Sequence, residues 1–317
     1  MSDQQFFAIV GVGRSGTTLL MSMLNAHPKI AIIPEIHFVS QYIMKRPFAK
    51  LSEAIKMTSN DPRFARLNLT IDDVMKPFFK DNKSFSMDIL YKRILQLYAS
   101  KQGVRIIGDK APKNIECLPI LHRIFKNPKI IHLIRDPRDV YLSRKKADWS
   151  KSRKDILQLL AYRSQYSLGR RFGPRLFGKN YLEIHYEKLI NKPNIELNRI
   201  CKLLAVTFDK RMLNFSASAR ELVFEDEIAW KKEALGPLLK NNMNKWKLEL
   251  NPRKIRFIEA ACSPTFDGGF YKRRYKILGI QRPIVNVVIK NIMGILSVFY
   301  ETIVRFNNLR AIRSIQS

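Results

Sequence analysis

The stretch GVGRSGTTLL at residues 11–20 follows an apolar run at residues 6–10 and leads into a segment with helical spacing. Glycines in a turn between a strand and a helix let the backbone adopt conformations that other residues avoid. The first N–H groups of the following helix have no partner inside the helix, so they attract anions. This order of elements predicts an α/β fold with an anion-binding turn near its N-terminus.

The turn departs from the common phosphate-binding pattern at one position. The pattern G-x-x-x-x-G-K-[ST] requires a lysine at position 17, where this chain has Thr17. Arg14 supplies a positive charge from inside the turn, and a planar guanidinium can bind two oxygens of a phosphate or sulfate at once. We expect a phosphate-like ligand held by a scheme other than that of the nucleoside triphosphatases. A glycine-rich turn without a ligand is the alternative from this stretch alone.

Short apolar runs rich in β-branched residues recur along the chain, at residues 6–10, 29–34, 105–110, 129–135 and 181–187. Segments with helical spacing lie between them, and this repeated pattern predicts a mainly parallel sheet with helices on both faces, a three-layer α/β/α fold. Ligands bind such sheets at the carboxyl ends of the strands. The polar residues that follow the runs are Arg14, Glu35, Lys110, Arg135 and Tyr186.

The charge balance narrows the choice of partners. The 317 residues include 57 Lys and Arg against 27 Asp and Glu, which gives a net charge of +30. Such a charge attracts polyanions: nucleic acid, anionic lipid, acidic glycan or a multiply charged nucleotide. Basic residues cluster at 143–154, 169–175 and 271–276, where we expect solvated surface. Nucleic acid is the weaker candidate because its common binding modules interleave aromatic and basic residues in patterns that this sequence lacks.

The three cysteines, Cys117, Cys201 and Cys262, are far apart, and the sequence has no C-x-x-C or H-E-x-x-H motif. This spacing argues against a disulfide framework or a metal centre, and it is compatible with a reducing compartment. The first strand is predicted within a few residues of Met1, which leaves no room for a signal peptide. We therefore expect a cytoplasmic catalytic domain that needs no metal.

Two segments are predicted to add to the central fold. Residues 40–104 show mostly helical spacing. We expect them to form an insertion that covers the ligand site at the strand ends, on the side where a second substrate, the acceptor, would bind. Residues 276–317 are predicted to contain an amphipathic helix that begins after Pro283. Its polar or small residues recur at spacings of three and four and form a narrow stripe: Asn286, Lys290, Gly294, Ser297, Glu301, Arg305 and Asn308.

Three environments remain open for this C-terminal helix. It could pack on the domain, or it could lie at a membrane interface through residues 284–313, flanked by Arg305, Arg310 and Arg313. A true span is the third alternative, although Lys290 and Glu301 interrupt the uncharged run of about 18 residues that spanning helices show.

Two motifs together resemble a known family. KIIHLIRDPRDVYLSR at residues 129–144 places an arginine at a strand end and a serine eight residues later. It resembles the 3′-phosphate-binding segment of sulfotransferases that use 3′-phosphoadenosine 5′-phosphosulfate (PAPS). G-x-x-R-S-G-T-T after the first strand resembles the 5′-phosphosulfate loop of the same family. Further matches are PEIHF at 34–38, GDKAPKN at 108–114 and HYEKLINKP at 185–193.

The resemblance implies a P-loop-like sulfotransferase domain at residues 1–275, with the tail 276–317 outside it. It assigns the cradle of the 5′-phosphosulfate to Arg14, Ser15, Gly16, Thr17 and Thr18. It assigns the 3′-phosphate to Arg135 and Ser143, and it makes Tyr186 an aromatic neighbour of the nucleotide. The basic loop that completes the 3′-phosphate site in this family has Lys240, Lys272 and Arg273 as candidates.

The resemblance also implies catalytic roles. Glu35 occupies the position of the acidic general base of Golgi-type glycan and protein-tyrosine sulfotransferases, and Lys110 that of the lysine which contacts the sulfuryl group and the bridging oxygen. Arg14 would help to stabilise the departing phosphate oxygen. Structural roles remain open for Glu35 and Lys110. Glu35 could be a loop carboxylate that pairs with His37, and Lys110 could be a surface lysine.

The function implied is transfer of a sulfuryl group from PAPS to a hydroxyl of a glycan or glycolipid. Protein-tyrosine or small-phenol sulfation is the alternative within the family. A basic nucleotide-binding protein that docks on nucleic acid or membrane is the alternative outside it, and the presence of both Glu35 and Lys110 argues against that reading. The apolar tail favours a lipid-linked acceptor and peripheral contact at the inner membrane face.

Overall fold

The computed structural model of the chain describes residues 4–80, 85–217, 236, 240–275 and 284–316. At its centre is a five-stranded sheet in the order β2-β3-β1-β4-β5, and every neighbouring pair is parallel. The strands are β1 (Gln5–Gly11), β2 (Ile30–Ile33), β3 (Ile106–Lys110), β4 (Lys129–Ile134) and β5 (Tyr181–His185). Four of them lie within the predicted runs, and β1 extends one residue beyond its run at each end, so the parallel α/β fold is confirmed.

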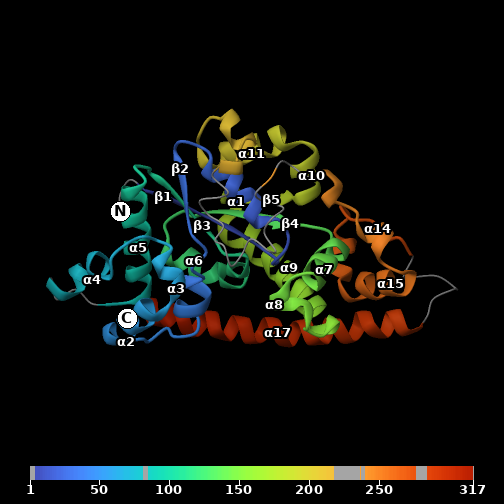
Figure 1. Cartoon of the computed structure of the whole chain (residues 1–317). Coiled ribbons are helices and arrows are strands. Elements are labelled where there is room, and N and C mark those ends of the chain that lie inside the picture. Colours follow the sequence, from blue (N-terminus) through green and yellow to red (C-terminus); the bar gives the residue numbers. More distant parts are fainter. Residues whose placement is uncertain (1–3, 81–84, 218–235, 237–239, 276–283, 317) are drawn as a thin grey trace.

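The alternation of side chains along β1 explains the layers. Phe6, Ala8 and Val10 point into one core, and Phe7 and Ile9 point into a second core on the opposite face of the sheet. Helices cover both faces, as Figure 1 shows. Such strands must be apolar on both sides, because neither face of the sheet meets water.

One face of the sheet is covered by helices that come after β1 or after β5 in the sequence. They are α1 (Thr17–Asn25), α10 (Tyr186–Asn191), α11 (Pro193–Leu204) and the 3₁₀ helix η4 (Lys210–Leu213). The other face carries α5 (Met87–Lys101), the 3₁₀ helix η2 (Pro112–Cys117), α6 (Leu118–Ile124) and the C-terminal part of α9 (Asp155–Phe177). The expected three-layer arrangement is therefore present.

A third core lies beyond the carboxyl ends of β1 and β4. There α7 (Pro137–Lys145) and α9 pack with α15 (Pro252–Ala261) and α16 (Ser263–Asp267). Asp136 caps α7 by accepting a hydrogen bond from Arg138 N (2.9 Å), and Asn251 caps α15 by accepting one from Lys254 N (2.9 Å). The short elements of this region are α8 (Asp148–Lys151), η6 (Lys240–Asn242) and α14 (Trp246–Glu249). A further short element, η3 (Gly178–Asn180), directly precedes β5.

Residues 40–104 are mainly helical, as expected. They contain α2 (Leu51–Asn60), α3 (Pro62–Ala65), α4 (Ile71–Lys80) and α5, after a short π-helix η1 (Val39–Ile43). The break near residue 60 is explained by Asp61, which accepts from Arg63 N (3.0 Å) and starts α3 at Pro62. Residues 81–84, which follow α4, lie outside the described residues.

The C-terminal helix is the longest element, α17 (Ile284–Gln316), and runs along one side of the molecule in Figure 1. It packs on α6, α9 and α15, so contact with the domain extends over much of its length. Residues 276–283, where the predicted tail begins, lie outside the described residues.

Candidate active site

The turn between β1 and α1 has the geometry that its glycine predicts. Gly16, the N-cap of α1, has a φ of 95°, and a Cβ there would lie 2.4 Å from Cδ2 of Tyr186. Only glycine fits, because both the left-handed backbone and the Tyr186 ring exclude a side chain. Arg14 also has a positive φ, 76°, inside the same turn. The N-terminus of α1 is thus held open at the carboxyl end of β1, where an anion can approach it.

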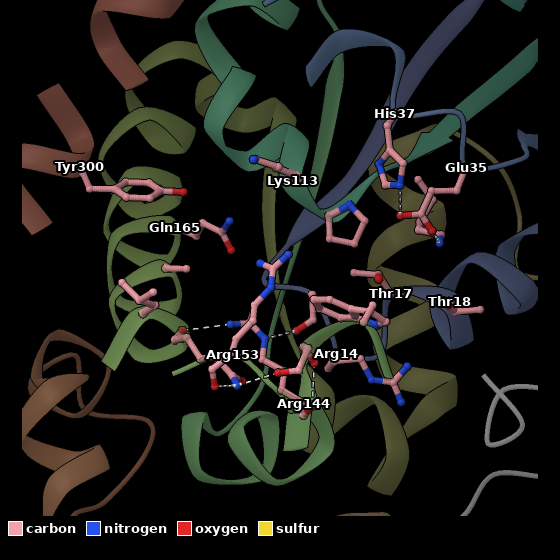
Figure 2. A pocket seen from close by; sticks show the side chains of 18 residues that line it. Arg14, Thr17, Thr18, Glu35, His37, Lys113, Arg144, Arg153, Gln165 and Tyr300 are labelled. Atoms are coloured by element: carbon pink, nitrogen blue, oxygen red, sulfur yellow. Dashed lines mark hydrogen bonds and ion pairs between the residues drawn. The ribbon is translucent and has the colours of Figure 1, made fainter. Parts of the chain in front are cut away.

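A cavity of about 680 Å³ lies beside this turn. Figure 2 shows the side chains that line it. Its inner end is formed by residues that the sequence predicted, namely Arg14, Thr17, Thr18, Glu35 and Lys110. Its mouth is formed by the start of α9, by Trp149 and Arg153 near α8, and by Tyr300 of α17. None of the 18 lining residues lies in the segment 40–104, so its acceptor-side role stays a prediction.

Glu35 and Lys110 form an ion pair at the inner end. The parallel register of β2 and β3 pairs Ile33 with Asp109, and this brings the two residues that follow the strand ends together. The Lys110 side chain is 1% exposed and that of Glu35 is 14% exposed. His37 Nε2 lies 3.4 Å from Glu35 Oε1 on the side away from the sheet. The carboxylate of Glu35 is thus held between Lys110 and His37 at the inner end of the cavity.

Asp109 lies beneath this pair in the protein interior. Its carboxylate accepts hydrogen bonds from Tyr91 Oη (2.6 Å) and Asn114 Nδ2 (2.9 Å). Burial, together with the negative charge of Glu35, raises the pKa of Asp109 to about 6. Asp109 thus fixes the end of β3 from behind, while Lys110 points into the cavity.

The predicted 3′-phosphate residues lie next to the turn. Arg14 Nε donates to Ser143 Oγ (3.0 Å), so these two residues are in contact across 129 positions of sequence. Arg135 is buried and donates to the carbonyl oxygens of Arg14 (3.2 Å) and Asn242 (2.6 Å). Its guanidinium carbon lies 4.3 Å from the centroid of the Tyr186 ring. The structure therefore brings Arg14, Arg135, Ser143 and Tyr186 together.

The residues here fit an anionic nucleotide. Ser15 Oγ and Arg135 Nε are buried and have no hydrogen-bond partner among the described residues. Buried polar groups normally have a partner, so two unsatisfied groups at a helix N-terminus indicate a place where ligand oxygens are accommodated. Neither Arg135 nor Ser143 lines the cavity itself; both lie behind the turn.

Of the three candidates for the basic loop, the segment of Lys240 is the one that reaches this region. Asn242, in the same short helix η6, accepts from Arg135 and donates to Tyr186 Oη (3.2 Å). Asp139 holds the following residues by accepting from Asn244 N (2.7 Å) and Trp246 N (3.1 Å). The Lys240 side chain itself lies outside the described residues.

The other two candidates have different surroundings. Arg273 donates to Asp267 (2.7 Å), and Lys272 is exposed. Neither is a lining residue of the cavity.

The expectation that residues 143–154 form solvated surface is wrong for part of the segment. Arg144 is buried and donates to the carbonyl oxygens of Gly13 (3.3 Å) and Gln158 (3.0 Å). Burial lowers the pKa of Arg144 to about 10. With Trp149 and Arg153 it lines the cavity. Its position just after Ser143, within the segment that resembled a nucleotide site, was the available signal.

Metal ligands are not gathered in the described residues. The three cysteines are buried and unpaired with one another. No group of three or more His, Cys, Asp or Glu side chains that could hold an ion occurs in the part of the chain described above. The charged side chains at the inner end of the cavity include Arg14, Glu35 and Lys110.

Comparison with known proteins gives several protein-tyrosine sulfotransferases among the relatives. The chain is 25% identical over 220 residues to protein-tyrosine sulfotransferase A of Caenorhabditis elegans, covering 66% of this chain and 52% of that protein. It is 23% identical over 224 residues to protein-tyrosine sulfotransferase 2 of Gallus gallus, covering 65% and 52%. The chain thus spans about half the length of these curated relatives.

Solved structures share the fold. The sulfotransferase domain from the Synechococcus PCC 7002 olefin synthase aligns with a TM-score of 0.61 at 23% identity, covering 85% of this chain and 96% of that one. The sulfotransferase domain from the curacin biosynthetic pathway aligns with a TM-score of 0.56 at 22% identity, covering 78% and 92%. The model of the sulfotransferase family matches residues 7–210, more than half of the chain. The chain belongs to the sulfotransferase family.

Proposed function

We propose that this enzyme transfers a sulfuryl group from PAPS to a hydroxyl of a glycan or glycolipid. The observation that carries the proposal is the meeting of the Glu35–Lys110 ion pair with Arg14 and the N-terminus of α1 at one end of a single cavity. A base, cations and a helix N-terminus are the groups that such a transfer requires within reach of one another.

The donor would lie along the turn between β1 and α1. Arg14, Ser15, Gly16, Thr17 and Thr18 would hold its 5′-phosphosulfate, since their backbone leads into the helix N-terminus. Arg135 and Ser143 would hold the 3′-phosphate, with the Tyr186 ring beside Arg135. Bound there, the donor supplies a sulfuryl group on a phosphate leaving group.

The residues of the chain would share the transfer between them. Glu35 takes the proton of the acceptor hydroxyl as the acceptor oxygen bonds to sulfur. Lys110 and Arg14 donate to the phosphate oxygen that departs as its bond to sulfur breaks. General-base assistance of this kind contributes about 10²- to 10⁴-fold. Because Lys110 is buried beside Glu35, one ion pair serves both the proton and the leaving group.

The mouth of the cavity supports an acceptor with an apolar part. Trp149 and Leu157 are 44% and 56% exposed there, and Tyr300 and the cations Lys113 and Arg153 lie close by. Apolar and aromatic walls with a few polar groups are typical of sites for amphiphilic ligands. A glycolipid hydroxyl fits this combination.

Tyrosine in a protein is the second candidate acceptor. The curated relatives named above are protein-tyrosine sulfotransferases, which favours this alternative over a small phenol. A binding protein without catalysis has no use for a buried lysine paired with a carboxylate at the inner end of a cavity.

The test is transfer of isotopically labelled sulfur from PAPS to a panel of acceptors: a neutral glycolipid in vesicles, a soluble glycan, a tyrosine peptide and a small phenol. We expect label in the glycolipid, and none when Glu35 is replaced by Gln. Label only in the peptide would replace the acceptor, and label in no acceptor together with no binding of the desulfated donor would overturn the proposal.

A further inference from the structure

The burial of α17 is the reverse of that of an ordinary surface helix. Most of its stripe of polar residues faces the protein: Ser297, Glu301 and Asn308 are 4%, 5% and 2% exposed, whereas Arg305 of the stripe is exposed. The apolar residues buried beside them are Met293, Val304 and Ala311. Phe299 and Phe306, on the opposite side, are 72% and 66% exposed. Surface helices normally bury the apolar side and expose the polar one. The helix therefore carries its apolar face on the outside of the molecule.

Specific hydrogen bonds fix this orientation. Ser297 Oγ lies 2.8 Å from Ser164 Oγ of α9. Arg171 donates to Glu301 Oε2 (2.7 Å), and Asn308 Nδ2 donates to the carbonyl oxygen of Glu116 (2.8 Å). Turning the helix over would leave these buried polar groups without partners, which costs free energy for each one. The polar stripe is the attachment of α17 to the domain.

The exposed apolar surface is concentrated on this one helix. Among the described residues, twenty large apolar side chains are strongly exposed, and eleven of them belong to α17. They are Ile284, Val285, Val288, Ile292, Ile295, Leu296, Val298, Phe299, Ile303, Phe306 and Leu309. We call this set the outer face. Monomeric soluble proteins rarely expose contiguous apolar patches beyond a few hundred square ångströms, so such a face marks an interaction surface.

Charge decides which surface it meets. Arg305, Arg310 and Arg313 are exposed near the C-terminal end of α17, and the chain carries a net charge of +30. A second copy would bring the same charge against the outer face, whereas an anionic bilayer surface attracts it. Apolar residues beside arginines are the combination found in helices that lie in the headgroup region of membranes.

The same contacts favour a helix in the membrane plane over one that spans it. By length and composition α17 could cross a bilayer. To do so it would have to leave the domain and carry Glu301, Asn308 and Asn286 into hydrocarbon, where polar groups are expensive. With its stripe held by α6 and α9, only the outer face is available to lipid.

The outer face is also next to the cavity. Tyr300, between Phe299 and Glu301, lines the cavity and is labelled in Figure 2. Leu157 and Trp149 line the same cavity. Its hydroxyl donates to Glu116 Oε1 (2.5 Å), and burial together with the charge of Glu116 raises the pKa of Tyr300. A bilayer in contact with α17 would therefore lie beside the entrance used by the acceptor.

We propose that the outer face of α17 inserts into the interfacial region of an anionic bilayer, parallel to its plane, and so places the cavity mouth at the membrane surface. Entry of a lipid-linked acceptor from that surface rests on the proposed function. The membrane contact itself does not, because it follows from α17 alone.

Co-sedimentation of the full chain with vesicles tests the contact without any enzyme assay. The probes are vesicles of phosphatidylcholine alone and with about a third phosphatidylserine, each at low and high salt. We expect binding to the anionic vesicles that weakens with salt, and at least tenfold weaker binding for the triple variant Phe299→Gln, Ile303→Gln, Phe306→Gln.

A matched triple variant keeps the result specific. Phe79→Gln, Ile195→Gln and Leu248→Gln remove three equally exposed apolar residues from α4, α11 and α14, and this variant should bind vesicles like the wild type. Thermal stabilisation by 3′-phosphoadenosine 5′-phosphate (PAP) in all three proteins reports on the donor site separately.

Three results would overturn the proposal. They are equal vesicle binding by both triple variants, no vesicle binding by the wild type, and a dimer in solution that only the α17 variant abolishes. The last result would assign the outer face to a second copy. A dye on Val288→Cys and on Phe299→Cys gives the orientation, since an in-plane helix places both at the same depth and a spanning one places Phe299, near its middle, deeper than Val288, near its end.

Discussion

The two ends of the cavity are built in opposite ways. The inner end comes from short stretches at the ends of β1, β2 and β3, where Arg14, Glu35 and Lys110 follow their strands within a few residues. The mouth comes from helices far apart in sequence, since Trp149 and Tyr300 belong to segments about 150 positions from each other. Backbone register places the inner groups, whereas tertiary packing of α17 on α9 places the outer ones.

This difference assigns separate roles to the two ends. Groups that lie at or within three residues of the strand ends are positioned by the parallel sheet, as chemistry requires. Side chains at the mouth, such as Tyr300 of α17, can differ without changing the reaction at the inner end, so they can determine which acceptor or surface the enzyme contacts. Substitutions at the inner end should therefore change turnover or folding of the loop, and substitutions at α17 should change where the enzyme acts.

The largest effect is expected at the inner end, on the rate of transfer. Glu35→Gln removes the base but keeps an oxygen near Lys110, so kcat should fall about 10²- to 10⁴-fold while the affinity for PAP is unchanged. Steady-state kinetics and calorimetric titration measure the two quantities. Glu249→Gln, which changes a partly exposed carboxylate paired with Lys146, is the control and should turn over normally. Full turnover by Glu35→Gln would remove this residue from the mechanism.

The next effect concerns the turn itself. Gly16→Ala combines a left-handed backbone with a clash against Tyr186, so it should lower the free energy of unfolding by roughly 2–5 kcal/mol and weaken PAP binding. Gly103→Ala is the matched control, because its φ is 65° but its Cβ would meet open space. It should cost only about 1–2 kcal/mol and leave PAP binding alone. Denaturant unfolding compares the two, and equal costs would mean that Tyr186 does not confine the turn.

Two adjacent residues of α17 test its reversed burial. Asn308→Ala removes a buried hydrogen bond to Glu116 and should cost about 1–3 kcal/mol of stability. Leu309→Ala trims a side chain that is 60% exposed and should change stability by less than about 0.5 kcal/mol. Urea unfolding of both variants gives the answer. A larger cost for Leu309 than for Asn308 would show that the helix packs by its apolar face in solution.

The last effect depends on pH and concerns the interior behind the sheet, where His132 of β4 faces α9. Its Nδ1 is 2.6 Å from Tyr181 Oη, and burial lowers its pKa from the ordinary 6.5 to about 3. Between pH 6.5 and about 3, His132 is protonated in the unfolded chain but not in the folded chain. The contribution of His132 is thus complete above pH 6.5 and is lost as the pH falls toward 3, by about 1.4 kcal/mol per pH unit.

Asp109 opposes this trend over part of the range. Its pKa is raised from 3.8 to about 6, so the folded chain binds the extra proton between these values and gains stability as the pH falls. Unfolding free energies measured from pH 7 to 4 should therefore fall less steeply for His132→Asn than for the wild type. His122→Asn, at an exposed position on α6, should keep the slope of the wild type. A shared slope in all three proteins would mean that His132 is accessible to protons.

Local patterns were sufficient for the sheet and the inner end. The apolar runs predicted the strands because a strand buried on both faces is apolar throughout, as β1 is. The turn, Glu35 and Lys110 were found because parallel strands end at one edge of the sheet. Their roles in the reaction stay predictions that the kinetics above will decide.

Packing between distant segments limited the rest. Arg144 was expected in solvent, because nothing near it in sequence shows that Gly13 and Gln158 accept its hydrogen bonds. The stripe on α17 was visible from its spacing, yet periodicity alone separates two faces without saying which one meets the protein.

The most direct test of the central claim is thermal stabilisation by PAP, measured beside ATP with magnesium on the wild type and on Arg14→Asn. Asparagine tolerates the left-handed backbone at position 14 and removes the charge. At a hundredfold excess over its dissociation constant a ligand stabilises by about 2.7 kcal/mol. We expect that stabilisation from PAP in the wild type and its loss in Arg14→Asn. Stabilisation by ATP with magnesium alone would contradict the assignment of the turn to a sulfuryl donor.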